Sequence, residues 1–139
     1  MKALHLPGLA FALAIVGCAT TPVPDSAASA VPPDRLYAPA MARPVTGGGS
    51  INVRRDSGLM GSACSTRVWI NGQPAADLRS SERITINVEA GDHIVSAQPN
   101  ALCAGGLVEA QAVVKPGRTA RFRVGYGTNG DFILAPTAF

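Results

Sequence analysis

The sequence predicts an all-β fold, a small sandwich or barrel that occupies the chain from residue 50 to residue 139. Three observations lead to this prediction. No segment of this region keeps the spacing of apolar residues that is typical of an amphipathic helix. Short runs of alternating apolar and polar residues occur instead, and turn residues separate them. About ninety residues are enough for one small domain, so a single core is expected.

Eight strands are expected from this alternation. In the first, Ile51 and Val53 alternate with Asn52 and Arg54. Because successive side chains of a strand point to opposite faces, the apolar set of each strand turns towards a shared core. The expected strands are 50–55, 65–70, 73–78, 83–88, 92–98, 107–114, 118–126 and 131–135.

The turns between these strands fall into two groups. The Asn-Gly pair at 71–72 is the strongest hairpin signal, because both residues tolerate a positive φ, and Lys-Pro-Gly at 115–117 fits a type II turn. If successive strands alternate in direction, these two turns and the one at 89–91 lie at one end of the domain. The longer connections, which include 56–64 and 99–106, then lie at the opposite end.

The first residues are typical of an export signal. Lys2 supplies a positive charge, and residues 4–16 form an almost wholly apolar run. A membrane-spanning helix needs about 20 apolar residues, and this run ends at the Thr-Thr-Pro of 20–22.

Cys18 follows the order Ile-Val-Gly, which resembles the lipobox of bacterial lipoproteins. The resemblance implies that residues 1–17 are a cleaved signal peptide and that Cys18 carries a diacylglyceryl thioether, with acyl chains such as palmitate in the membrane. An ordinary signal peptide that happens to contain a cysteine is the alternative. Ala19, where some lipoproteins have Asp, implies the outer membrane facing the periplasm under the familiar sorting rule.

The count of three cysteines fits this interpretation. If Cys18 carries lipid, Cys64 and Cys103 remain as a pair in an oxidising compartment, where a disulfide is the default. The rival interpretations are a metal site and a catalytic thiol. Two lone cysteines without CxxC spacing argue against zinc.

Residues 18–49 are expected to form a flexible tether between the lipid and the domain of residues 50–139. The segment is rich in Pro, Ala, Ser and Thr, and such a composition buries too little apolar surface to fold. Leu36, Tyr37 and Met41 are its few large apolar side chains. Because the tether joins the first strand at the tight-turn end, the long loops are expected to point away from the membrane.

Three short stretches of the domain resemble PEGA-type and DUF2846-like domains. They are 68–72 (Val-Trp-Ile-Asn-Gly), 84–88 and 90–95, the last with a Gly-Asp-His sequence, although the PEGA tetrad itself is absent. The resemblance implies an immunoglobulin-like or transthyretin-like antiparallel sandwich. It also implies an envelope module without a defined catalytic activity.

No catalytic constellation is indicated. Asp92 and His93, with Ser96 nearby, are neighbours on one strand, so the side chains of Asp92 and His93 point to opposite faces and form no relay. Glu89 and Glu109 could pair only if the fold brings them together. The sequence contains no phosphate loop, no HExxH and no metal-ligand spacing, so we expect no enzyme activity, cofactor or metal.

A basic and aromatic sheet face is a candidate binding surface. Arg67 and Trp69 share one face of their strand, and Arg121 and Arg123 share one face of theirs. If both faces lie on the same side of the domain, they form a basic surface suited to anionic envelope polymers. An ordinary solvated face is the alternative. From residue 47 on, nine Lys and Arg stand against seven Asp and Glu, which argues against nucleic acid as a partner.

These observations predict a non-catalytic, lipid-anchored module of the cell envelope with a protein or glycan partner. Long loops carry recognition more often than tight turns, so Asp56, Met60, Asn100 and Leu102 are the expected contact residues. An inhibitor of a lysozyme-like enzyme or an envelope-assembly lipoprotein is the alternative. The small and apolar residues of the loop 56–64 argue against an inhibitor.

Overall fold

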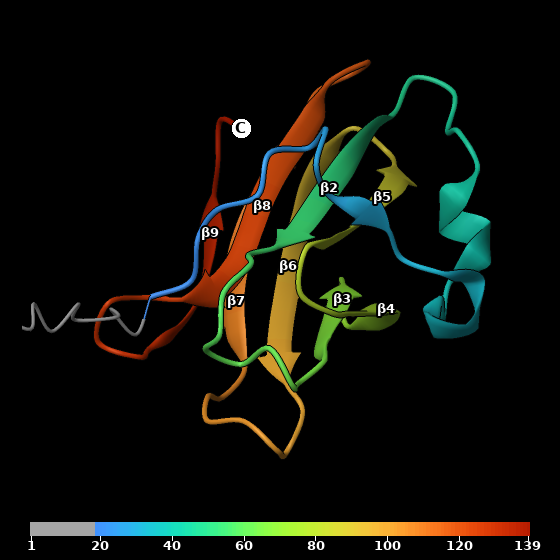
Figure 1. The fold of residues 1–139 in the computed structure, drawn as a ribbon. Coiled ribbons are helices and arrows are strands. Elements are labelled where there is room, and N and C mark those ends of the chain that lie inside the picture. Colours follow the sequence, from blue (N-terminus) through green and yellow to red (C-terminus); the bar gives the residue numbers. More distant parts are fainter. Residues whose placement is uncertain (1–18) are drawn as a thin grey trace, which may run out of the picture.

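The structure is a computed structural model that describes residues 19–139, so the expected signal peptide and Cys18 lie outside the described residues. Two β-sheets pack face to face (Figure 1). In the described part of the chain the helical elements are two short 3-10 turns, η1 (Pro33–Arg35) and η2 (Pro39–Ala42). The strands are β1 (Ser29–Ala30), β2 (Gly49–Arg55), β3 (Thr66–Ile70), β4 (Gln73–Leu78), β5 (Glu82–Val88), β6 (Gly91–Pro99), β7 (Val108–Val114), β8 (Thr119–Tyr126) and β9 (Phe132–Pro136).

The predicted all-β sandwich is confirmed, and strands β2 to β9 match the eight expected strands to within one residue at each end. Only β1 was not expected. The alternation that predicted the strands is also the pattern of burial. Ile51 and Val53 of β2 are fully buried, and so is Val124 of β8. These side chains meet those of the opposite sheet in one apolar core.

The strand order is β1-β5-β2-β8-β9 in one sheet and β4-β3-β6-β7 in the other. Most neighbours are antiparallel, but β2 pairs with β8 in parallel, as β1 does with β5. Strands β2 to β9 alternate in direction, so β2 and β8 run the same way when the sheet brings them together. In an immunoglobulin domain the second strand pairs with the first and the fifth strand. Here its counterpart β3 pairs with β4 and β6, so the transthyretin-like alternative is retained.

Residues 19–48 form a strap that lies against the sandwich, and the expected flexible tether is therefore wrong. Val31 is buried in the core, and Leu36 and Met41 pack against it. β1 pairs with the exposed edge of β5, and Leu36 forms a bridge with Ala76 on the edge strand β4. The strap thus gives hydrogen-bond partners to two sheet edges. These bonds stabilise its ordered conformation, although its composition alone indicates a disordered segment.

The strap also changes where the chain enters the domain. The tight turns and the long loops lie at opposite ends, as expected, but Thr20 donates its backbone N–H to Tyr126 O at the end of β8 (2.9 Å). Thr21 pairs with Ser57, just after β2. The strap begins at the long-loop end and crosses the sandwich (Figure 1). The expected entry of residues 18–49 at the tight-turn end is therefore wrong for the described part of the segment, which begins beside the long loops at Thr20.

Within residues 19–139 the structure contains no helix with the length and apolar composition needed to span a membrane.

Candidate functional site

A disulfide joins the two long loops, as the cysteine count predicted. Cys64 and Cys103 are linked across 39 residues of sequence, and their Cα atoms are 6.1 Å apart. We call the segments 57–65 and 100–107, which this bond connects, the stapled loops. The bond makes them one structural unit, because neither can move without the other.

A buried arginine supports the stapled loops from beneath. Arg55, the last residue of β2, donates hydrogen bonds to Gly61 O and Cys64 O, and to Leu78 O at 3.0 Å. Burial lowers the pKa of its guanidinium. The side chain therefore connects the first stapled loop to the end of β4 at this end of the core.

Asp56 is not available for a partner, contrary to the expectation that it is a contact residue. Its side chain is only 2% exposed and accepts two hydrogen bonds from Arg123, at 3.2 and 2.5 Å. Thr20 Oγ1 lies 2.9 Å from the same carboxylate. Asp56 therefore fastens the start of the strap to β8, a role that its place in a loop sequence did not reveal.

The other three expected contact residues lie at the surface of the stapled loops. Leu102 is 81% exposed, and Met60 is also exposed. Asn100 is exposed but structured, since its side chain hydrogen-bonds Ser65 Oγ and accepts the N–H of Leu102. Leu59, 83% exposed, belongs to the same surface although it was not among the predicted contacts.

A polar groove runs along the outer side of β3 and the end of β4. It consists of two adjoining hollows of about 290 and 470 Å³ that share Ser65, Asp77 and Asn100. The remaining lining residues are Arg67, Trp69, Gln98 and Pro99 in the first hollow, and Arg35, Ser62, Ala63, Cys64 and Arg79 in the second.

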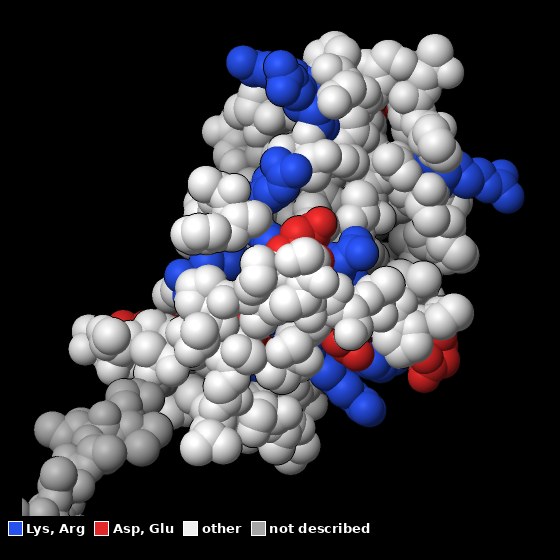
Figure 2. Space-filling model, turned by 45° about the horizontal axis from the view of Figure 1, so that its top comes forward, with Lys and Arg blue, Asp and Glu red and all other residues white. Residues whose placement is uncertain are grey.

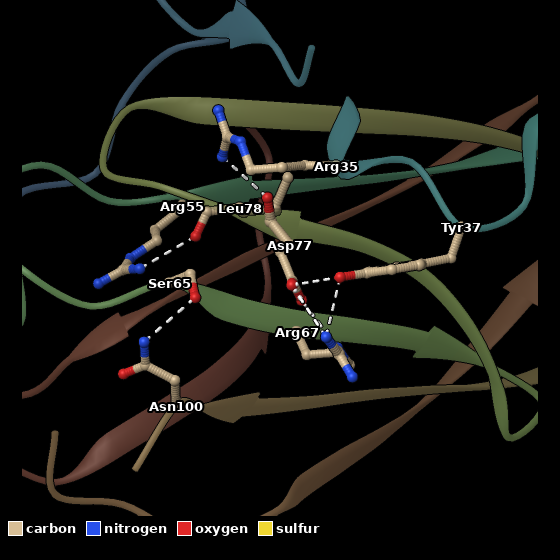
Figure 3. A network of polar contacts seen from close by, with 8 residues as sticks. All are labelled: Arg35, Tyr37, Arg55, Ser65, Arg67, Asp77, Leu78 and Asn100. Atoms are coloured by element: carbon tan, nitrogen blue, oxygen red, sulfur yellow. Dashed lines mark hydrogen bonds and ion pairs between the residues drawn. The ribbon is translucent and has the colours of Figure 1, made fainter. Parts of the chain in front are cut away.

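The wall of this groove is a network of hydrogen bonds between the strap and β3 and β4 (Figure 3). Arg67 binds the Asp77 carboxylate through two nitrogens, at 2.8 and 3.0 Å. Tyr37 of the strap donates its hydroxyl to Asp77 at 2.6 Å, and the Arg67 guanidinium lies 4.7 Å from its ring centre. Arg35 forms a bidentate pair with Glu82 and also donates to Asp77 O.

The protonation states of this network suit binding better than proton transfer. Hydrogen bonds from Arg67 and Tyr37 hold the pKa of Asp77 below its ordinary value. The hydrogen bond to Asp77 raises the pKa of Tyr37. At neutral pH the carboxylate is therefore ionised and the phenol protonated, and neither group titrates in the range that general acid–base catalysis uses.

The predicted basic and aromatic face does not form. Arg67 and Trp69 lie on the outer face of the sheet β4-β3-β6-β7, whereas Arg121 and Arg123 lie on the outer face of the other sheet. Arg123 is also paired with Asp56. On the face drawn in Figure 2, acidic and uncharged residues separate the Lys and Arg side chains. The alternation of side chains predicts which residues of a strand share a face, but it does not predict which sheet the strand joins.

The structure places a further arginine where sequence reasoning expected a solvated side chain. Arg54 is 1% exposed, and in the register of the sheet it lies between Arg83 of β5 and Arg123 of β8. Within the described residues its Nε and Nη1 have no hydrogen-bond partner. Arg54 alternates with core residues along β2, so the sequence pattern alone predicts an outward, solvated side chain.

The Asp92, His93 and Ser96 residues do not form a catalytic group. Both ring nitrogens of His93 are used in the tight turns, one with Asn71 Nδ2 (2.9 Å) and one with Glu89 O (2.8 Å). Ser96 instead donates to Glu109 Oε1 at 2.8 Å. Among residues 19–139, no group of three or more His, Cys, Asp or Glu side chains is placed to hold a metal ion.

Comparison with models of known protein families and with curated proteins found no match to this chain.

Proposed function

We propose that this protein is a lipid-anchored, non-catalytic module of the bacterial cell envelope, attached through Cys18 to the outer membrane on its periplasmic side. The lipobox-like order before Cys18 and the disulfide between the other two cysteines support the proposal. The likeness to PEGA-type and DUF2846-like envelope domains agrees with it. The observation that carries it furthest is the attachment of Thr20, two residues after Cys18, to the rigid domain. A lipid on Cys18 would hold the domain directly at the membrane surface.

We infer that the polar groove is the binding surface of this module and that a glycan of the envelope is its ligand. Trp69 offers a half-exposed ring, and Gln98 and Asn100 offer amide groups beside it. Arg79 is exposed and, within the described residues, forms no ion pair. Stacking on an aromatic ring combined with planar hydrogen-bonding groups is suited to a sugar chain, and arginine adds a preference for its anionic groups.

Capture from envelope extract tests this proposal. The protein on beads should retain envelope glycan, and isolated peptidoglycan is the first defined probe. The variant Trp69→Ala with Arg79→Ala should retain at least about tenfold less, the loss expected for removal of an anchoring contact of about 1.4 kcal/mol. A control, Val113→Ala with Arg118→Ala, changes exposed residues away from the groove and should bind normally. Equal retention by both variants would contradict the assignment of the groove.

The alternative, an inhibitor of a lysozyme-like enzyme, would present polar residues on a protruding loop to catalytic carboxylates. The stapled loops contain no charged residue, so the structure offers nothing that favours this alternative.

A further inference from the structure

The largest exposed apolar side chains of the stapled loops lie at the end of the domain where the strap begins. Leu59 and Leu102 are more than four-fifths exposed, and Met60 and Leu107 are also exposed. The disulfide holds both loops together, and Thr20 is fixed at the same end through Tyr126 and Asp56. Soluble proteins rarely keep several large aliphatic side chains exposed on neighbouring loops without a surface to contact.

The same end lacks the charges that would oppose contact with lipid. From Ser57 to Thr66, and again from Ile94 to Val108, the sequence contains no Asp, Glu, Lys or Arg. The other two connections at this end contain the charged residues Arg79 and Asp131, and Asp56, before the first stapled loop, is buried and paired with Arg123. This distribution suits a shallow contact by the stapled loops alone.

The backbone of the stapled loops is also prepared for a medium with little water. Amide groups buried without partners oppose entry into lipid. Here the N–H groups of Ser62, Cys64 and Cys103 donate to carbonyls within the loops. Arg55 donates to Cys64 O and also to Gly61 O, which already accepts the N–H of Cys64, and the Tyr126 hydroxyl donates to Ala104 O at 2.9 Å.

We propose that the stapled loops contact the membrane that holds Cys18 and place Leu59, Met60 and Leu102 in its interfacial layer. The occupant is a lipid surface because Cys18, the proposed site of lipid attachment, is only two residues before Thr20, which is fixed at the same end as these loops. The inference rests on the proposed lipid anchor. It reverses the expected orientation, since the long loops then face the membrane and the tight turns face away from it. One hollow of the polar groove is lined partly by these loops, through Ser62, Ala63 and Cys64, whereas the other extends along β3 to Arg67 and Trp69.

Fluorescence quenching by brominated lipids tests this orientation in the full lipid-bearing protein. The chain has one tryptophan, so a Trp69→Phe background leaves a single indole after each further substitution. Leu102→Trp places the indole on a stapled loop. Ile94→Trp is the matched control, because Ile94 is exposed beside the tight turn at Asn71. Vesicles of phosphatidylethanolamine and phosphatidylglycerol with brominated acyl chains are the probe.

The Leu102→Trp protein should be quenched at least about twofold more than the Ile94→Trp protein, because interfacial side chains lie about 5–10 Å below the headgroup boundary. Leu59→Trp should repeat the result from the other loop. Weak quenching at both ends would overturn the inference. So would a blue-shifted but unquenched Leu102→Trp protein, which would indicate cover by a second copy or a protein partner. Mass spectrometry of the same sample distinguishes failure of this inference from failure of the proposed lipid anchor. An acylated Cys18 with unquenched loops overturns this inference alone, whereas absence of acyl chains overturns the proposed anchor as well.

Discussion

At the scale of single residues, Gly125 determines whether the strap can close on β8. A Cβ atom at this position would overlap Thr20 Oγ1 and the Asp56 carboxylate, the two groups that fasten the strap. Because the clash is with a buried ion pair, neither group can move away freely. The absence of a side chain is therefore a condition for the contact between the strap and the sheet.

Gly125→Ala should destabilise the protein by roughly 1–3 kcal/mol, the usual cost of overpacking a tight site. Urea unfolding followed by circular dichroism measures the change. Gly106→Ala is the matched control, because nothing lies within 4 Å of a Cβ atom there. If both alanine variants were equally stable, the contact between Thr20 and Asp56 would not hold the strap.

Arg54 leads to a prediction of the opposite sign. Its buried Nε and Nη1 lack partners within the described residues, and a buried donor without a partner costs about 1–3 kcal/mol. Arg54→Met keeps the length of the side chain and removes that cost, so the free energy of unfolding should rise by roughly 1–3 kcal/mol. The exposed Arg121→Met should change it by less than about 0.5 kcal/mol. A less stable Arg54→Met protein would show that the guanidinium contributes to folding.

At the scale of elements, the sequence predicted the strands well and the strap poorly. The strands of the sandwich follow from alternating side chains and turn residues, both of which are local signals. The strap depends on single apolar residues, such as Val31 and Leu36, that meet the core and sheet edges far away in the sequence. A composition rich in proline indicates disorder only when no such edge is available to pair with it.

Acid should weaken the attachment of the strap. Burial tends to raise the pKa of Glu82, but hydrogen bonds from Arg35 and from the N–H of Arg79 outweigh it and lower the pKa below its ordinary 4.5. The pKa of Asp77 is likewise held below 3.8, mainly by Arg67. Groups with lowered folded-state pKa values contribute stability above their ordinary values and lose it as the pH falls through the folded values.

The free energy of unfolding should therefore decline as the pH falls below about 4.5. Urea titrations between neutral and acid pH measure the decline. A protein with Asp77→Asn and Glu82→Gln should be less stable at neutral pH, and its decline in acid should be shallower. An unchanged slope would show that these two carboxylates do not couple the strap to pH.

The disulfide should be the largest single contribution to stability among the loop contacts. Closing a loop of 39 residues corresponds to about 4 kcal/mol in the chain-entropy estimate. The double variant Cys64→Ala, Cys103→Ala should lose about 2–5 kcal/mol in chemical unfolding. A loss near zero would mean that Arg55 and the loop hydrogen bonds hold this end without the bond.

At the scale of the whole molecule, the position of the strap decides which end of the domain the proposed lipid anchor would bring to the membrane. The sequence indicated correctly that the cysteines and long loops share an end. It could not indicate that the strap begins at that same end, because this depends on contacts of Thr20 with Tyr126 and Asp56. For the same reason Asp56 was expected to be accessible, and the polar groove, which Arg35 of the strap helps to line, was not predicted.

Mass spectrometry of the protein extracted from bacterial membranes tests the central claim most directly. The proposed anchor predicts a mature chain that begins at Cys18, with a diacylglyceryl group on the thiol and an acyl chain on the new N-terminus. Cys18→Ser should abolish these masses and release the protein from the membrane fraction, while the bond between Cys64 and Cys103 persists. A soluble mature chain that begins at another residue and carries no acyl group would contradict the account.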